Sequence, residues 1–198
     1  MAYFLIRDGK AIIPKGTTEI PEYTFDDCDE LTTVVIPEGV ETIGEGAFFG
    51  CESLTEITIP KSVTSIGKAA FYDCYALTEI TIPERITEIP EDAFTHCEEL
   101  TTVVISEGVE SIGDSAFSNC ESLTEITIPK SVTSIGECAF YDCYSLTKIT
   151  IPEGVTSIGD GAFDSCHALE TIYVPAGKVE YFKGLLPEDL HDKIVEME

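Results

Sequence analysis

Cysteine recurs along this chain at a fixed interval. Seven of the eight cysteines stand 23 residues apart, with a phenylalanine three residues before each and a leucine three residues after. They are Cys28, Cys51, Cys74, Cys97, Cys120, Cys143 and Cys166. Self-similarity at a period of about 20 to 50 residues is the sequence signature of a repeat protein. The chain is therefore expected to fold as a stack of similar coils.

The copy that begins at Leu54 explains one coil physically. Apolar and polar residues alternate over residues 54–59, which predicts a strand buried on one face, and Pro60 ends it. Residues 63–66 form a second short extended piece, and Gly67 permits a turn. Residues 70–74 begin with Ala-Phe and end with Cys, which indicates a short helical or 3-10 turn. Each coil should therefore have three sides.

A single coil cannot bury its apolar edge, so neighbouring coils must stack with their strands parallel. The template L-x-x-I-x-I-P-x-x-V-x-x-I-G-x-x-A-F-x-x-C-x-x predicts interior columns of Leu, Ile, Val, Phe and Cys. Residues 31–168 hold six full copies, residues 1–30 a hairpin cap with a partial copy, and residues 169–198 a partial copy with a second cap. We expect one structural domain with the fold of a β-rich solenoid.

Both ends depart from the template, as the open ends of a solenoid require. Asp8-Gly9 lies between two apolar triplets, which predicts a tight hairpin. Residues 176–186 predict a short helix that buries Val179, Phe182 and either Leu185 or Leu186, and residues 193–197 predict a final extended piece.

A longer period is superimposed on the short one. Residues 18–84 recur with changes at residues 87–153, an offset of 69 residues or three coils. Residues 52–61 and 121–130 are identical. A block of three coils has therefore been duplicated.

The IP, IG, AF and C signatures of the template resemble those of leucine-rich repeats of the BspA-like type, also called the Treponema pallidum type. Common leucine-rich repeats carry Asn or Cys eight residues after the first Leu. This chain carries Gly39, Ser62, Arg85, Gly108, Ser131 and Gly154 there, so the usual asparagine ladder is absent. The resemblance covers residues from about 11 to 175. It implies a right-handed, curved superhelix and a non-enzymatic module of surface proteins, bacterial or protist, that attach to other proteins.

Charge and hydropathy exclude several partners. The chain has 37 acidic and 11 basic residues, a formal charge of -26, so it repels nucleic acid and anionic membranes. Polar residues interrupt every apolar run, so no membrane insertion is expected. Residues 1–10 lack the pattern of a signal peptide. A cell-surface or secreted location follows only from the family resemblance.

No set of residues has the pattern of a catalytic or metal-binding site. The periodic cysteines should be reduced and buried, whereas Cys138 stands at a variable position and should be partly exposed. The three histidines fall at unrelated template positions and lack metal-ligand spacing. The acidic residues at 26, 27, 29 and 30 form a solvated turn without a calcium-binding spacing. We expect no enzymatic activity, cofactor or metal.

Specificity should therefore reside in exposed columns, because solenoids recognise partners through such surfaces. Two candidates compete: a column on the main sheet and the Tyr-Asp-Cys-Tyr motifs. Their residues are Thr58, Thr81, Thr127, Thr150 and Tyr173 for the first, and Phe49, Tyr72, Tyr75, Tyr141 and Tyr144 for the second. The threonines have a structural interpretation as strand formers, and the aromatic residues as packing between coils.

The sequence thus predicts a monomeric protein-binding or adhesion module with an unidentified protein partner. Two alternatives remain open at this stage. One is a structural spacer or stalk, and the other is a consensus-like array without a specific partner.

Overall fold

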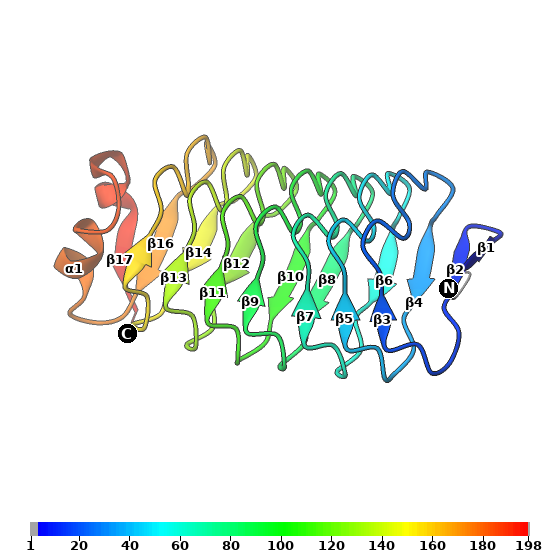
Figure 1. The fold of residues 1–198 in the computed structure, drawn as a ribbon. Coiled ribbons are helices and arrows are strands. Elements are labelled where there is room, and N and C mark those ends of the chain that lie inside the picture. Colours follow the sequence, from blue (N-terminus) through cyan, green and yellow to red (C-terminus); the bar gives the residue numbers. More distant parts are fainter. Residues whose placement is uncertain (1–3, 198) are drawn as a thin grey trace.

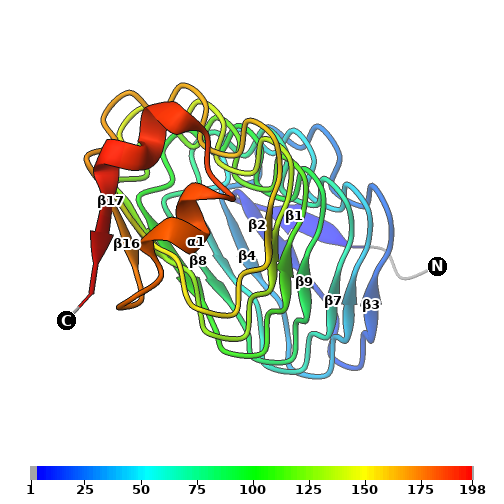
Figure 2. The same cartoon turned by 90° about the vertical axis from the view of Figure 1, so that its left-hand side faces the viewer.

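Successive coils of the chain lie side by side along one axis and form an elongated stack (Figure 1). The structure is a computed structural model that describes residues 4–197. The parallel-strand solenoid has about 8 turns of about 23 residues each, which confirms the fold predicted from the repeat. Figure 2, turned by 90°, shows the coils one behind another with similar outlines. Buried apolar side chains fill the space inside the coils.

The first side of each coil is a strand of the main sheet. These strands are β2 (Lys10–Ile12), β4 (Thr33–Val35), β6 (Glu56–Thr58), β8 (Glu79–Ile82), β10 (Thr102–Ile105), β12 (Glu125–Thr127), β14 (Lys148–Thr150) and β16 (Thr171–Val174). Most neighbours pair in parallel at the repeat offset, so Val34 lies opposite Ile57 and Val35 opposite Thr58. The strands β6 and β8, and likewise β10 and β12, lie next to each other without pairing. Equivalent side chains therefore form columns, with every second column facing outward.

A shorter strand forms the second side. These strands are β3 (Glu19–Ile20), β5 (Thr42–Ile43), β7 (Ser65–Ile66), β9 (Glu88–Ile89), β11 (Ser111–Ile112), β13 (Ser134–Ile135) and β15 (Ser157–Ile158). They pair in parallel as two groups, β3 to β7 and β9 to β15. The isoleucine of each strand is buried in the interior, except Ile158, which is half-buried.

The third side consists of consecutive turns rather than a continuous helix. In the second coil, Ala47, Phe49 and Cys51 each donate a backbone hydrogen bond to the carbonyl three residues earlier. On this side, two positions per coil have positive φ and interrupt any helix; in the second coil they are Gly46 and Gly50, with φ of 54° and 66°. The chain can therefore reverse direction in few residues.

The first of these left-handed positions explains the variable small position noticed in the sequence. It is occupied in turn by Tyr23, Gly46, Ala69, Asp92, Ser115, Cys138 and Gly161, all with φ between 51° and 65°. A side chain there costs about 1 kcal/mol relative to glycine, because its Cβ crowds the backbone. The position selects for conformation and not for a particular side chain.

Replacing Cys138 with glycine should raise the free energy of unfolding by about 0.5 kcal/mol. The relief of backbone crowding at φ 53° exceeds the extra entropy that glycine gives to the unfolded chain. Urea denaturation measures the change. The neighbouring Ala139→Gly variant is the control and should lower stability, since Ala139 is buried and lies outside the left-handed columns. A destabilised Cys138→Gly protein would contradict the explanation.

A column of stacked phenylalanines fills the interior beside the turns. Consecutive rings from Phe25 to Phe163 lie with centroids 5.1 to 5.6 Å apart and planes within 8° of parallel. The periodic leucines and alanines are buried next to them. The interior columns predicted from the template are thus the core of the protein.

Six of the seven periodic cysteines are core residues with one specific contact, whereas Cys28, also expected to be buried, is half-buried because its turn lies at the open end of the stack. Six of the eight are buried, and each buried thiol donates a hydrogen bond to the carbonyl of a phenylalanine 26 residues earlier. The Sγ-to-oxygen distances run from 3.1 Å for Cys51 to 3.4 Å for Cys97. A thiol fits here because it is small and apolar yet satisfies a carbonyl of the preceding coil.

Threonine ladders provide hydrogen bonds between coils where asparagine ladders are absent. The hydroxyl of Thr55 donates to the carbonyl of Thr32 at 3.1 Å, and Thr101 donates likewise to Thr78 at 3.1 Å. A second ladder includes Thr133 on Glu110 at 3.2 Å. Because each bond spans 23 residues, it fastens one coil to the one before.

Both ends carry additional elements. At the front, β1 (Leu5–Arg7) pairs antiparallel with β2 through a turn at Asp8 and Gly9, whose φ angles are 50° and 74°. The expected first segment also includes residues 1–3, which lie outside the described residues.

At the back, α1 (Val179–Lys183) is shorter than the helix expected over residues 176–186, because Gly177 has a φ of 75° and delays its start. It buries Phe182, while Leu186 is buried after the helix ends. A 3-10 helix, η1 (Glu188–Lys193), then leads into β17 (Ile194–Glu196), which pairs in parallel with β16. Residue 198 of the expected final segment lies outside the described part.

Candidate functional site

The outward column of the main sheet carries the predicted threonines. It runs Ile12, Val35, Thr58, Thr81, Val104, Thr127, Thr150, Tyr173 and Val195 from the first to the last coil. Thr58, Thr81 and Thr127 are exposed, whereas Thr150 and Tyr173 are half-buried. The valines are notably accessible, since Val35 is 67% and Val104 49% exposed. The column is thus a mixed polar and apolar surface.

Three hollows lie along this column. The first, about 520 Å³, is lined by Thr58, Thr81 and Val104, among others. The second, about 560 Å³, includes Val104 and Thr127. The third, about 670 Å³, includes Thr127 and Thr150. Because neighbouring hollows share lining residues, they form one groove that crosses the strands from β6 to β14.

A row of prolines forms one wall of the groove. Pro60, Pro83, Pro129 and Pro152 follow their strands and are buried, and Pro175 continues the row. Proline ends a strand because it has no N–H to donate to the next ladder bond. Ser106 replaces proline in the coil of β10, and its N–H donates to the carbonyl of Ile82 at 3.2 Å. The rigid apolar wall is therefore interrupted once.

Charged residues border the groove, and most are acidic. They are Glu38, Glu56, Glu79, Glu84, Glu107, Glu125 and Glu153, against Lys61, Lys130 and Lys148. Glu153 forms an ion pair with Lys178 at 2.9 Å, but its side chain stays largely exposed. The excess of carboxylates favours a cationic ligand over an anionic one.

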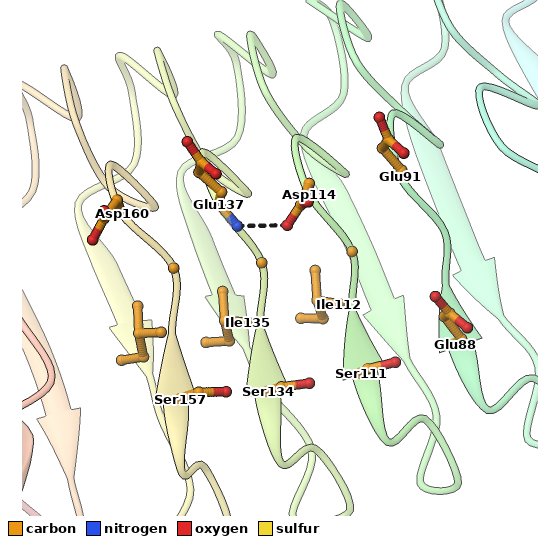
Figure 3. Close-up of a pocket in the computed structure, with 14 residues that line it drawn as sticks. Glu88, Glu91, Ser111, Ile112, Asp114, Ser134, Ile135, Glu137, Ser157 and Asp160 are labelled. Atoms are coloured by element: carbon orange, nitrogen blue, oxygen red, sulfur yellow. Dashed lines mark hydrogen bonds between the residues drawn. The ribbon is translucent and has the colours of Figure 1, made fainter.

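The second sheet carries another shallow hollow of about 630 Å³, which the sequence did not point to (Figure 3). Serines 111, 134 and 157 line one side, and Glu91, Asp114, Glu137 and Asp160 the other. The only hydrogen bond drawn there runs from the Glu137 amide to Asp114 Oδ1 at 2.8 Å. The fixed interval between these carboxylates was visible in the sequence, but such spacing alone does not separate a binding strip from a solvated face.

The aromatic candidates lie on the turn side and mainly contact one another. Phe49 stacks on Tyr72 with ring centroids 4.9 Å apart and planes 4° apart. His96 meets Tyr72 edge-on at 5.5 Å and Tyr75 at 6.5 Å. These side chains are half-buried, and burial is the main cause that raises the pKa of Tyr72. The first motif therefore packs against its neighbouring coils.

The second motif is more accessible. Tyr141 is 36% and Tyr144 41% exposed, and Tyr144 stacks on His167 with centroids 5.8 Å apart. The structure does not bring either aromatic motif together with the threonine column, because the two surfaces belong to different sides of the coil.

Native thiol labelling should reach only Cys28 and Cys138. These two are half-buried, while burial raises the pKa of Cys51 to about 12 and that of Cys97 well above its usual value. The thiolate is the reactive form, so buried thiols should react only after denaturation. Mass spectrometry after brief alkylation would identify the labelled residues. A Cys138→Ser protein should lose one labelled site, and rapid labelling of Cys97 in the folded protein would contradict the burial of the thiol column.

A metal site and a membrane-spanning helix each have structural requirements that can be compared with the described residues. Within residues 4–197, no three side chains of His, Cys, Asp or Glu are grouped so that they could hold a metal ion. The acidic residues 26, 27, 29 and 30 are exposed in a turn. No helix in this part of the chain has the length and apolar character needed to cross a membrane.

Solved structures of bacterial repeat proteins share this fold. A leucine-rich repeat protein from Bacteroides ovatus is 28% identical, with a TM-score of 0.75 over 96% of this chain and 53% of that one. One from Eubacterium ventriosum is 27% identical, with a TM-score of 0.52 over 87% of this chain and 41% of that one. The chain thus spans about half the length of these relatives or less.

The Treponema pallidum leucine-rich repeat protein is 24% identical, with a TM-score of 0.58 over 91% of this chain and 84% of that one, and supports the fold alone. No curated protein matches the chain. The family model for the BspA type leucine rich repeat region matches residues 18–130 and 87–184. The protein therefore belongs to the BspA-type leucine-rich repeat family.

Proposed function

We propose that the main-sheet face binds an extended segment of a partner protein, and that the protein acts as a recognition module without enzymatic activity. The observation that carries the proposal is the continuous groove along the outward column from Thr58 to Thr150. Extended segments bind well to such surfaces because alternate side chains enter hollows while the others face solvent. Adhesion at a cell surface would be one use of this recognition.

The groove has the mixed chemistry that protein recognition needs. Exposed Val104 and the proline wall offer apolar contact, while the threonine hydroxyls and glutamates offer hydrogen bonds and charge. Burying apolar surface contributes roughly 25 cal/mol per Å², and the polar groups fix orientation. A spacer would need neither the apolar wall nor the exposed valines.

Selection from a displayed library of random peptides tests the proposal. We expect the protein to enrich peptides that bind saturably, and we expect Val104→Lys to abolish their binding, because the new side chain enters the middle hollow. Ser157→Lys places the same charge on the second sheet and should leave binding unchanged. Failure to enrich any peptide would favour the spacer alternative, and peptide binding that survives Val104→Lys would contradict the groove as the binding site.

A further inference from the structure

The first and third hollows of the groove are copies of one another. Eight lining residues of the first recur, unchanged in type, 69 residues later in the third. The pairs are Glu38 and Glu107, Thr58 and Thr127, Ile59 and Ile128, Pro60 and Pro129, Lys61 and Lys130, Thr81 and Thr150, Pro83 and Pro152, and Glu84 and Glu153. The three-coil duplication has therefore reproduced these eight lining residues, while Glu79 and Ser106 of the first hollow correspond to Lys148 and Pro175.

The middle hollow is different in kind. It has one lining proline, Pro129, which it shares with the third hollow, whereas Ser106, which replaces proline in the coil of β10, lines the first hollow. The duplication therefore gives two proline-walled pockets separated by a more open stretch. We name them the front pocket, around Pro60 and Pro83, and the rear pocket, around Pro129 and Pro152.

We propose that the front and rear pockets bind two apolar side chains, four residues apart, of one extended and positively charged segment of a partner protein. This inference rests on the proposed function of the main-sheet face. It adds the spacing and the chemistry of the segment that the face recognises.

The spacing follows from the stacking of coils. Parallel strands lie about 4.8 Å apart, so pockets three coils apart are separated by about 14 Å. An extended chain rises about 3.4 Å per residue, so four residues also span about 14 Å. Residues four apart in an extended chain point to the same side, so both side chains can enter the groove together.

The walls of the two pockets indicate that the two bound side chains of the partner segment are apolar. Pro129 and Pro152 are buried in the rear pocket beside Ile128, and Met197 and Pro175 close its far end. In the front pocket, Pro60, Pro83 and exposed Val104 offer a similar wall. Prolines hold such a wall rigid, so little side-chain entropy is lost when an apolar group enters.

The positive charge of the segment follows from the groove borders. The front pocket is lined by three glutamates and one lysine, and the rear pocket by two glutamates and one lysine: Glu38, Glu79, Glu84 and Lys61 at the front, and Glu107, Glu153 and Lys130 at the rear. The whole chain carries a formal charge of -26, which attracts a cationic segment over a long range. Lysine or arginine between the two anchors would meet Glu84 and Glu107, which border the intervening stretch.

Synthetic fluorescent peptides test the inference by polarisation titrations. The probe carries two phenylalanines four residues apart, with lysine and threonine elsewhere. One control has the same composition with adjacent phenylalanines, and another has glutamate in place of lysine. We expect the spaced probe to bind about tenfold more tightly than the adjacent control, because only it engages both pockets. We expect the acidic control not to bind.

Matched protein variants assign the binding to the pockets. Thr58→Lys fills the front pocket and Thr127→Lys the equivalent place in the rear pocket, and both residues are exposed on the sheet. Each should weaken the spaced probe about tenfold and bring it to the affinity of the adjacent control. Ser157→Lys should leave the affinity unchanged, and circular dichroism verifies that each variant is folded. Thr81→Lys is the second front-pocket variant if Thr58→Lys does not fold.

The outcomes separate this inference from the proposed function. Equal affinities for the spaced and adjacent probes would overturn the two-pocket inference, and the proposed function would stand if Thr58→Lys still weakened both. Probe binding that neither Thr58→Lys nor Thr127→Lys affects would overturn both proposals. Absence of binding by the spaced probe would overturn the two-pocket inference, leaving the library selection to decide the proposed function.

Discussion

Replacing Phe94 with alanine is expected to lower the free energy of unfolding by about 4 kcal/mol. Phe94 is fully buried in the middle of the phenylalanine column and stacks on Phe71 at 5.1 Å and on Phe117 at 5.3 Å. The substitution removes both stacking contacts and leaves a cavity that rigid neighbouring coils cannot close. The loss should therefore lie in the upper part of the range for large-to-small core substitutions.

Urea denaturation followed by circular dichroism measures this loss. Phe163→Ala is the matched control, because Phe163 ends the column and has a stacked ring on one side only. Phe163→Ala should lower the free energy of unfolding by clearly less than Phe94→Ala does. Equal losses at the two positions would show that stacking between coils contributes little.

Replacing Gly136 with alanine should cost about 3 kcal/mol, although only one methyl group is added. A Cβ at this position would lie 2.5 Å from the amide nitrogen of Asp114 and 2.5 Å from the carbonyl carbon of Gly113. Both atoms belong to the backbone of the preceding coil, so the two coils must separate. Overpacking in a core costs about 1 to 3 kcal/mol, and backbone contacts place this case at the upper end.

The control for this substitution is Gly154→Ala. The nearest atoms to a Cβ there lie at 3.1 and 3.2 Å, and other coils carry Ser62 and Ser131 at the same template position. Its effect should be well below that of Gly136→Ala in the same denaturation experiment. A harmless Gly136→Ala would show that neighbouring coils can move apart without loss of stability.

The sequence predicted the stacking of coils because the interior columns depend only on periodicity. The position of Phe94 or Cys97 follows from counting, and the parallel register at the repeat offset follows from the same count. The consecutive turns of the third side, with their two left-handed positions, could not be predicted from the periodicity. Left-handed residues such as Ala69 and Cys138 are poor formers of that conformation, so composition gave no signal of it.

The candidate site was predicted only in part. Alternation along the strands placed Thr58 and Thr127 on the outward face, where the structure has them. The groove itself depends on how proline walls and neighbouring strands combine in space, and no single coil contains it. For the aromatic motifs, the sequence did not show whether the side chains are exposed. In the structure, Tyr72 stacks on Phe49 of the neighbouring coil.

The two left-handed positions in every coil restrict how such a protein can change its length. An inserted or deleted residue would place the left-handed backbone conformation on a residue from another template position. It would also move every later side chain out of its column. Only the gain or loss of whole coils preserves the register, as the 69-residue duplication did. Lineages of such proteins should therefore differ by whole numbers of coils, and each added block brings its own copy of the proline-lined hollow.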